Sequence, residues 1–446
     1  MRIPFAAAPL FLLMSGGAFA ADGCPPGDTS ITNNGTSVSV IFDVFLATTT
    51  ASATCNLVAP TLLPEDTFAV YRADYRGFVI EGDTGTLTTT QGGVSDVAVI
   101  PGSATDFFHT GYVGSNAAGN IVSDISLNLQ SPSPPSQAGL DSVDYVELGR
   151  TTLASVESSI GDIATGRTGI VTHLNATSEL LVGGGQPVER PDNVALLGAV
   201  GSHTVGATGH LNMGDGFAVD GGVALFGQSV GESSADGLLF SGRAKYLQPD
   251  TGGIRLFGGA GINAAPGMSL GFTRQYDDGS ADGATVKSST SASLVGLYLE
   301  GGALYALDPS NEIAFTGTLL QSWLSVDGYS ETFGTDNLFP ATFGDSTNSF
   351  TTVKADAAWT SAVTPDIDLT VHGAIGHSFA NDAVAADVAF VGPVSVGGQS
   401  ELFAEYGARL GWTFGPSTTL GVFAQGSSGA VSGTHVQAGT TLSLQF

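Results

Sequence analysis

The segment from His435 to Phe446 reads HVQAGTTLSLQF, and its side chains alternate between two kinds. One set is apolar except for a threonine: Val436, Ala438, Thr440, Leu442, Leu444 and Phe446. The other set is polar except for a glycine: His435, Gln437, Gly439, Thr441, Ser443 and Gln445. Because successive side chains in a β-strand point to opposite faces, the segment predicts a strand with one apolar and one polar face. Such a strand fits a water-soluble sheet with a buried apolar face, and equally a transmembrane barrel with this face toward lipid.

The same alternation recurs upstream, from about residue 191 onward. It is clear in Leu238–Leu247, Ile254–Asn263, Val353–Thr360 and Glu401–Phe414. In a barrel, the polar faces of these strands line the lumen, and many of them carry charges near mid-strand. The charges expected to face the lumen are Asp220, Arg243, Lys245, Arg255, Glu300, Lys354, Asp356, Glu405 and Arg409. By the same parity, His372 and His435 are expected to line the lumen rather than to bind a metal.

The lengths of the connections favour a barrel over a soluble sandwich. We expect twelve strands, which begin near residues 204, 216, 237, 252, 268, 285, 311, 347, 366, 399, 417 and 434. Tight proline-containing connections are expected at 265–267, 308–310, 364–366 and 415–417, whereas Asp327–Ser346 and Phe379–Gly398 are long. Outer-membrane barrels alternate short periplasmic turns with longer external loops, which is the pattern that this reading gives.

A helix is expected immediately before the barrel. A Pro/Ser linker, Ser131–Ser136, precedes Asp141, a plausible N-cap, and apolar residues then recur at roughly helical spacing as far as Ala164. This stretch is too polar to face lipid, but a polar pore could hold it. The charged residues assigned to this pore helix are Glu147, Arg150, Glu157 and Asp162.

The N-terminal part of the chain is expected to be exported. Residues 1–20 have the form of a secretory signal peptide, with Arg2, an apolar core and the cleavage site Ala18-Phe19-Ala20. Residues 21–130 contain short β-type runs separated by turn residues and predict a small all-β domain. In an exported chain, Cys24 and Cys55 are expected to form a disulfide. Lipidation of Cys24 is the weaker alternative.

Composition excludes several classes of function. The chain has 13 Lys and Arg against 41 Asp and Glu, a net charge of −28, and no clustered cations for nucleic acid. It contains no catalytic or cofactor motif, so no enzyme activity, cofactor or metal site is expected. The acidic residues Asp277, Asp278 and Asp282 could bind Ca²⁺ weakly, but a solvated charge run is the simpler interpretation.

Together these features resemble the autotransporter proteins of Gram-negative outer membranes, from about Ser142 to Phe446. The carriers are the order of signal peptide, passenger, polar helix and twelve strands, and the C-terminal motif Leu442-Ser443-Leu444-Gln445-Phe446. The resemblance implies that Leu442, Leu444 and Phe446 form a signal for the outer-membrane barrel-assembly machinery. The implied partners also include the Sec translocon, outer-membrane lipid and lipopolysaccharide, with a monomeric barrel and a passenger displayed at the cell surface. The passenger departs from the family because it is short and shows no repeat, so its ligand stays unknown.

The predicted fold is therefore an all-β membrane protein: a 12-stranded antiparallel transmembrane β-barrel with a pore-lining α-helix, preceded by a small all-β N-terminal domain. The expected divisions are 1–20 signal peptide, 21–130 passenger, 131–190 linker and pore helix, and 191–446 barrel. Some members of the family cleave the passenger at an asparagine in the pore helix. Asn175, with Glu300 or Glu405 nearby, could serve in this way, although an attached passenger is the simpler expectation. The alternative function is a porin-like channel whose N-terminal domain stays in the periplasm.

Overall fold

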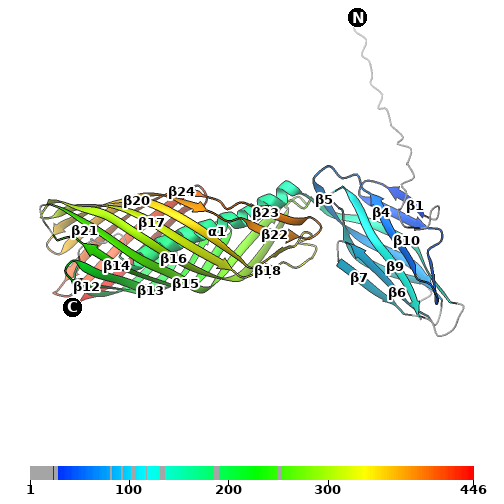
Figure 1. The fold of residues 1–446 in the computed structure, drawn as a ribbon, viewed down its shortest axis with the longest axis horizontal. Helices are drawn as coiled ribbons and strands as arrows, with labels where there is room; N and C mark the ends of the chain where they lie inside the picture. The colour runs from blue at the N-terminus through cyan, green and yellow to red at the C-terminus, as the bar shows by residue number, and fades with distance from the viewer. Residues whose placement is uncertain are drawn as a thin grey trace, which may run out of the picture. The chain divides into compact units, whose positions relative to one another are not determined.

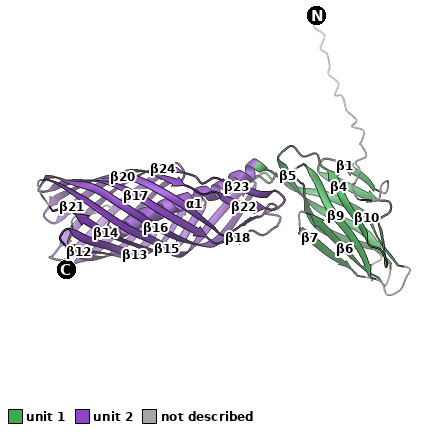
Figure 2. Cartoon of the chain, viewed as in Figure 1, with its two compact units in different colours: residues 1–153, 277–281 green, residues 154–276, 282–446 purple. Residues whose placement is uncertain are grey.

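The computed structural model describes residues 24, 29–80, 83–91, 94–101, 106–116, 118–130, 136–183, 190–249 and 253–446. The predicted signal peptide (residues 1–20) and most of the predicted linker (residues 131–135) lie outside these ranges. The chain forms two compact units (Figure 2): residues 1–153 with 277–281, and residues 154–276 with 282–446. Each unit is described below by itself.

The first unit is a β-sandwich of two antiparallel sheets. One sheet has the order β1-β2-β10-β5-β8, with β3 also paired to β10. Its strands are β1 (Thr29–Asn33), β2 (Ser37–Phe42), β3 (Leu46–Thr48), β5 (Thr67–Val79), β8 (Asp106–Gly114) and β10 (Gln137–Thr152). The other sheet has the order β4-β9-β6-β7. Its strands are β4 (Ala53–Pro60), β6 (Thr84–Gln91), β7 (Val94–Ile100) and β9 (Asn120–Gln130).

One hydrophobic core joins the two sheets of the sandwich. Val40 and Tyr71 from the first sheet and Leu57 and Leu127 from the second are fully buried in the same cluster. β2, β4 and β9 alternate buried and more exposed side chains, which is how an antiparallel sheet covers a core on one face. The predicted small all-β domain is thus a sandwich, completed by a strand that lies beyond the predicted boundary at residue 130.

The structure pairs Cys24 with Cys55, as the sequence predicted. Because this disulfide closes a loop between residues 31 apart in sequence, Cys24→Ser is expected to lower the free energy of unfolding of the sandwich by about 2–4 kcal/mol. The measurement is urea-dependent proteolysis of residues 29–130 in the full-length protein held in detergent. As a control, a reducing agent should destabilise the wild type equally and leave the variant unchanged. A wild-type protein that is insensitive to reduction would contradict the prediction.

Three tyrosines in the sandwich core make its stability depend on alkaline pH. Burial raises the pKa of Tyr71 to about 12 and also raises the pKa of Tyr75 and of Tyr145. Between pH 10 and 12 the unfolded chain has lost the Tyr71 proton while the folded chain keeps it, so stability falls as pH rises. For Tyr71 alone the loss is about 3 kcal/mol, at about 1.4 kcal/mol for each pKa unit. Unfolding of the sandwich is monitored by its susceptibility to proteolysis from pH 8 to 12. The free energy of unfolding should be constant below pH 10 and fall above it. A constant free energy of unfolding up to pH 12 would refute the prediction.

The second unit is a closed barrel of twelve antiparallel strands around one helix (Figure 1). The helix is α1 (Leu153–Leu181). The barrel strands in order are β11 (Asn193–Val200), β12 (His203–Gly214), β13 (Phe217–Val230), β14 (Ser233–Leu247), β15 (Ile254–Tyr276), β16 (Ala284–Asp308), β17 (Asn311–Val326), β20 (Ser346–Thr364), β21 (Ile367–Ala380), β24 (Glu401–Phe414), β25 (Thr418–Gly429) and β26 (Gly433–Gln445). The first and last strands pair from Asn193 with Gln445 to Val200 with Ala438, which closes the barrel. The predicted 12-stranded antiparallel β-barrel is therefore confirmed.

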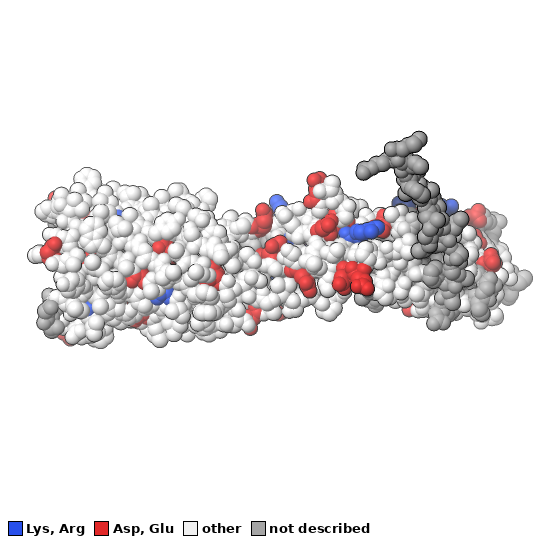
Figure 3. All heavy atoms as spheres, turned by 90° about the horizontal axis from the view of Figure 1, so that it is seen from above, with Lys and Arg blue, Asp and Glu red and all other residues white. Residues whose placement is uncertain are grey.

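The barrel is inside out relative to a soluble protein. Its outward side chains are apolar and exposed, among them Leu196, Leu225, Leu238, Leu299, Val353, Ile375, Leu402, Leu442 and Leu444. Its inward side chains include many buried polar groups, such as Ser241, Lys245, Asn263, Ser322, Thr352 and Gln437. Figure 3 shows that charged atoms are sparse along the barrel wall. Side chains of this kind on the outer wall are suited to lipid, so the barrel is a transmembrane one.

Exposed aromatic residues gather near one end of the barrel. This end carries the connections 308–311, 364–367 and 414–418, which join their strands by short turns. The exposed aromatic residues within a few positions of this end are Phe217, Tyr246, Tyr305, Trp359, Trp412, Phe414 and Phe446. A girdle of aromatic side chains is typical of the level at which a barrel wall meets the lipid headgroups.

At the opposite end, the connections 277–283, 327–345 and 381–400 are longer, whereas 201–202, 231–232 and 430–432 are short. Residues 327–345 and 381–400 form a four-stranded sheet beyond the barrel wall. Its strands are β18 (Tyr329–Ser330), β19 (Ala341–Phe343), β22 (Val384–Val388) and β23 (Gly392–Val396). The predicted alternation of short and long connections is therefore present from β15 to β25, but not in the rest of the barrel.

Two errors in the predicted strand list cancel. The sequence reading missed β11, whose eight residues follow a region rich in glycine and proline. It also divided β15 at Ala265-Pro266-Gly267, which was read as a tight turn. The structure instead shows one long strand with a register shift between Ala265 and Met268, because proline lacks the N–H that a regular ladder needs and is accommodated at a bulge.

The predicted helix from Asp141 to Ala164 is wrong over its first half. Residues up to Thr152 form β10, which pairs with β2 on one side and β5 on the other. Hydrogen bonding on both edges outweighs the weak helical spacing, and Val143 and Tyr145 point into the sandwich core. The real helix ends 17 residues later, at Leu181. No helix among the residues described is both long and apolar enough to cross a membrane.

Candidate functional site: the barrel lumen and its helix

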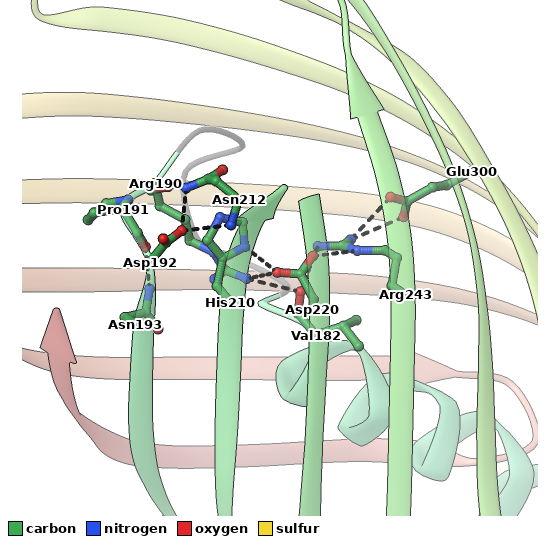
Figure 4. A network of polar contacts seen from close by, with 10 residues as sticks. All are labelled: Val182, Arg190, Pro191, Asp192, Asn193, His210, Asn212, Asp220, Arg243 and Glu300. Carbon is green, nitrogen blue, oxygen red and sulfur yellow. Dashed lines mark hydrogen bonds and ion pairs between the residues drawn. The ribbon is translucent and has the colours of Figure 1, made fainter. Parts of the chain in front are cut away.

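The lumen holds a network of buried charges near the short-turn end (Figure 4). Asp220 lies at its centre with no exposed side-chain surface. It accepts hydrogen bonds from Arg190 at 2.5 Å and Arg243 at 2.6 Å, and its Oδ1 lies 2.6 Å from Nδ1 of His210. Arg243 also contacts Glu300 at 3.2 Å. Since a buried carboxylate is costly without partners, these cations are what permits Asp220 to be charged inside the barrel.

The same network holds the C-terminal end of the helix. Arg243 Nη2 donates to the carbonyl oxygen of Val182 at 2.6 Å, which satisfies one of the carbonyls that a helix leaves free at its end. On the other side of the lumen, Lys354 bridges Glu179 of the helix and Glu405 of the wall; the Glu405 contact is 2.9 Å. The end of the helix is thus fixed to strands on two sides of the barrel.

The last third of the helix also makes neutral hydrogen bonds to the wall. Asn263 Nδ2 donates to Oδ1 of Asn175 at 3.1 Å, and Ser322 lies 3.4 Å from the same oxygen. The hydroxyls of Ser178 and Ser241 are 2.8 Å apart. A helix with polar groups on several sides is unsuited to lipid but suited to a polar lumen.

The middle of the helix is held near the long-connection end. Arg167 donates to Oδ1 of Asn348 at 2.6 Å, and Thr168 Oγ1 donates to the carbonyl oxygen of Gln399 at 2.9 Å. Nearby, Arg274 and Glu331 form an ion pair at 2.6 Å with both side chains almost fully buried. This pair joins β15 to the connection that contains the four-stranded sheet.

Two glycines let the helix approach the wall closely. A Cβ added to Gly166 would collide with the side chain of Ser233, and one added to Gly169 would collide with Val230. Any larger residue would therefore push the helix away from β13 and β14. The glycines that weaken the helix in sequence terms are what allow it to fill the lumen.

A cavity of about 150 Å³ lies beside the helix, which is room for several water molecules. Charged, imidazole and amide groups line it, chiefly His173, Arg243, Lys245, Glu300, Lys354, Asp356, His372, Glu405, His435 and Gln437. The rings of His173 and His435 lie 4.6 Å apart. No group of three or more His, Cys, Asp or Glu side chains that could hold a metal is found in the described part of the chain.

The structure places most of the predicted lumen charges together. Six line the cavity: Arg243, Lys245, Glu300, Lys354, Asp356 and Glu405. Asp220 lies in the network of Figure 4, Arg409 pairs with Asp368 at 2.7 Å, and Arg255 lies half-buried near the short-turn end of β15. The predicted lumen histidines, His372 and His435, both line the cavity, and His372 lies 3.6 Å from Asp356.

Only two of the four predicted pore-helix charges lie in the helix. Glu147 and Arg150 belong to β10 of the sandwich, where they form an ion pair at 2.7 Å. Glu157 and Asp162 are in the first three turns of α1 and are exposed. The correction follows from the strand assignment: the charges that hold the helix come from its later part and from the wall.

Asn175 lies inside the helix and is buried, rather than just past the helix end as the sequence suggested. Its hydrogen bonds are to Asn263 and Ser322. Neither Glu300 nor Glu405 is a hydrogen-bond partner of Asn175 among the described contacts. Asn175 acts here as a contact between helix and wall.

Sequence reasoning missed several members of the site. They are Arg167, Arg190, His210, Arg274, Glu179 and Glu331. One signal was available for the arginines. The chain has only 13 Lys and Arg residues, and several of them fall within the predicted strands or next to them. Because a charged side chain on the outer wall would face lipid, such residues are expected to point into the lumen.

The fold and lumen define the class of the protein: a transmembrane β-barrel of twelve strands with a polar helix inside it. No protein-family profile matches the chain, and a search of curated proteins found no match. Among solved structures, the chain is similar to the translocator domain of the autotransporter NalP from Neisseria meningitidis. The identity is 14%, the TM-score is 0.43, and the match covers 63% of this chain and 97% of that one.

Two further structures show the range of the likeness. The transport unit of the autotransporter AIDA-I from Escherichia coli matches at 11% identity and a TM-score of 0.38, covering 65% of this chain and 98% of that one. The NanC porin matches at 10% identity and a TM-score of 0.32, covering 57% of this chain and all of that one. The likeness concerns the barrel fold and extends to autotransporters and porins alike, so the function below rests on the chain's own geometry.

Proposed function

We propose that this protein is an outer-membrane autotransporter-type protein whose barrel anchors the N-terminal sandwich and displays it at the cell surface. The single observation that carries the proposal is the direction in which α1 passes through the barrel. The chain enters the lumen at the end with long connections and leaves it at the end with short turns.

The contacts of the helix support this direction. Arg167 and Thr168 bond to residues at the starts of β20 and β24, next to the long connections. Val182 bonds to Arg243, four residues before the short-turn end of β14. In outer-membrane barrels the short turns face the periplasm and the long loops face outward. A chain threaded in this direction emerges outside before Leu153.

Protease treatment of intact cells tests the proposal. An epitope tag is inserted in the connection between β8 and β9, residues 115–119, and a second tag is inserted separately in the short turn 364–367. We expect the first tag to be lost without lysis, while the second survives until the outer membrane is opened.

Each other outcome has a definite meaning. Protection of the first tag would place the sandwich in the periplasm and refute display. Loss of only the second tag would show that the short turns face outward, and it would refute the proposed direction of α1 through the barrel as well. Loss of both tags from cells that retain a periplasmic marker would also be incompatible with a membrane-anchored display protein of this topology.

The resemblance adds further parts to the proposal. Leu442, Leu444 and Phe446 are exposed on the outer wall, on the strand that closes the barrel against β11. This position supports the proposed role of the C-terminal motif in recognition by the barrel-assembly machinery. Export through the Sec translocon, contact with lipopolysaccharide, a monomeric barrel and the absence of enzyme activity remain predictions.

The second candidate is a porin-like channel. The observation in its favour is the cavity beside the helix, whose lining includes several charged side chains such as Arg243, Lys354 and Glu405. The two functions differ in what the helix does, because a plug has to move or be removed before a channel of this size conducts. Removal of the helix, considered in the Discussion, separates them.

A further inference from the structure

One face of the sandwich gathers the few positive charges of the first unit. Between Cys24 and Leu153 the sequence has thirteen Asp and Glu but only three Lys or Arg: Arg72, Arg76 and Arg150. Arg150 donates two hydrogen bonds to Glu147, at 2.7 and 2.9 Å, and Arg72 is paired in a similar way with Asp74. Arg72 and Arg76 both lie on β5, where Tyr71, Ala73 and Tyr75 point into the core. Alternation therefore puts both arginines on the outer face of the sheet.

Two exposed aromatic residues lie directly beside these arginines. In the register of β5 with β8, Arg72 is opposite Tyr112 and Arg76 is opposite Phe108. The Phe108 side chain is 61% exposed and Tyr112 is 50% exposed, which is unusual for large rings on a domain with a well-formed core. Arg76 Cζ lies 5.7 Å from the centre of the Phe108 ring. Because β8 is the edge strand of its sheet, the rings are open to the side as well as from above.

Hydrogen-bonding groups lie between the two Arg–aromatic pairs. Asp74 is opposite Thr110, whose hydroxyl donates to Oδ1 of Asp74 at 2.9 Å. Arg72 contacts the other oxygen of Asp74 at 2.9 Å. Across β10, Asp144 is the neighbour of Asp74 on the same face. The surface formed by Arg72, Asp74, Arg76, Phe108, Thr110 and Tyr112, called here the Arg–aromatic face, thus alternates cations, carboxylates and flat rings.

We propose that the Arg–aromatic face binds an acidic saccharide. Arginine pairs with carboxylate or sulfate groups in a planar, two-point geometry. Exposed aromatic rings provide flat apolar surfaces for the C–H faces of sugar rings, and the half-buried carboxylate of Asp144 can accept hydrogen bonds from sugar hydroxyls. Asp74 is buried and already accepts from Arg72 and Thr110, so it positions Arg72 rather than contacting the ligand. Arg72 and Arg76 are four residues apart, or about 13 Å at ~3.3 Å per strand residue, so one oligosaccharide can contact both.

The alternating charges favour this ligand over two others. An acidic peptide has few hydroxyls to donate to Asp144 and few flat C–H faces to stack on the exposed rings of Phe108 and Tyr112. Nucleic acid requires more cations than two in a chain with a net charge of −28. This saccharide site would give the displayed sandwich a ligand. It rests on the proposed display function only in that the sandwich must reach ligands outside the cell.

Binding is measured on the full-length protein in detergent, so the result does not depend on where the sandwich lies in the cell. The probes are an oligogalacturonate, which is carboxylated, and a heparin oligosaccharide, which is sulfated. Methyl-esterified oligogalacturonate serves as the neutral control, and poly-glutamate serves as the acidic peptide. We expect saturable binding of one or both acidic saccharides, with little binding of the ester or of poly-glutamate.

The variants locate the site. Arg76→Gln is expected to weaken binding about tenfold, and the double variant R72Q/R76Q about a hundredfold, if each arginine contributes a charge-assisted contact. Phe108→Ser should weaken binding severalfold. Arg150→Gln removes the same charge from the same unit at another place and should leave the affinity unchanged. Protease resistance of the sandwich confirms that each variant is folded.

Several results would overturn the inference. They are no saturable binding of either acidic saccharide, equal binding of poly-glutamate, and equal weakening by Arg150→Gln and Arg76→Gln. A site that binds as expected in a protein whose tag is protected in intact cells would refute surface display and leave the saccharide site standing. The two proposals therefore fail separately.

Discussion

Deleting Leu153–Leu181 is expected to raise the single-channel conductance of the protein in planar bilayers by about an order of magnitude, because the helix fills most of the lumen. The wall would then face a water-filled pore lined by the charges that now contact the helix. Conductance at fixed salt is the measurement, and the shift of the folded barrel on unheated gels confirms that the variant has assembled.

The matched control keeps the helix and removes the domain before it. A variant that lacks residues 24–136 should conduct as little as the full-length protein if the helix alone blocks the lumen. Equal conductance of the helix deletion and the wild type would show that α1 is not a plug, and the channel interpretation would then lead. High conductance of the control variant would assign the block to the sandwich instead.

Arg243→Met is expected to lower the free energy of unfolding of the barrel by about 3–5 kcal/mol, the usual cost of leaving a buried charge without its partner. Arg243 contacts Asp220, Glu300 and the carbonyl of Val182, so its loss leaves two buried carboxylates short of a cation and frees the helix end. Urea denaturation of the barrel in detergent micelles, followed by tryptophan fluorescence, measures the change, since all three tryptophans lie on barrel strands.

Lys287→Met is the control for Arg243→Met. Lys287 is an exposed cation near the far end of β16, and its replacement should change stability by less than about 0.5 kcal/mol. If both variants lose the same stability, the effect comes from net charge and the network around Asp220 has no special role. If Arg243→Met also raises the basal conductance, the network holds the plug as well as the wall.

The parity of side chains along each strand was the most informative signal in the sequence. In β26 and at Phe446 this parity correctly divided the residues from His435 onward between the inner and outer faces. The reason is that lipid contacts one face of a membrane barrel and a polar lumen contacts the other, so the two faces require opposite kinds of side chain. It also selected wall positions that face the lumen, including Lys354 and Glu405. It could not select their partners, because Glu179 and Arg190 come close to them only once the barrel is closed around the helix.

The helix shows why local spacing failed. Residues up to Thr152 have apolar side chains at intervals that suit a helix, but pairing on both edges makes them a central strand of the sandwich. Residues 165–181 contain glycines, threonines and an asparagine, which are poor helix formers in water. In the lumen these residues find hydrogen-bond partners and a close-fitting wall, so the tertiary environment decides the conformation.

The closed pairing of β11 with β26 around α1 has a mechanical consequence. A continuous ring of hydrogen-bonded strands encircles its own polypeptide, with folded structure before the encircled segment and the ring itself after it. Such an interlocked arrangement does not dissociate in the way that a bound subunit does, and no affinity constant describes it. A folded domain does not pass through a lumen that the helix already occupies. Its retention therefore persists until a peptide bond is cut or one of the two folded units is unfolded, whatever the salt, dilution or pulling direction.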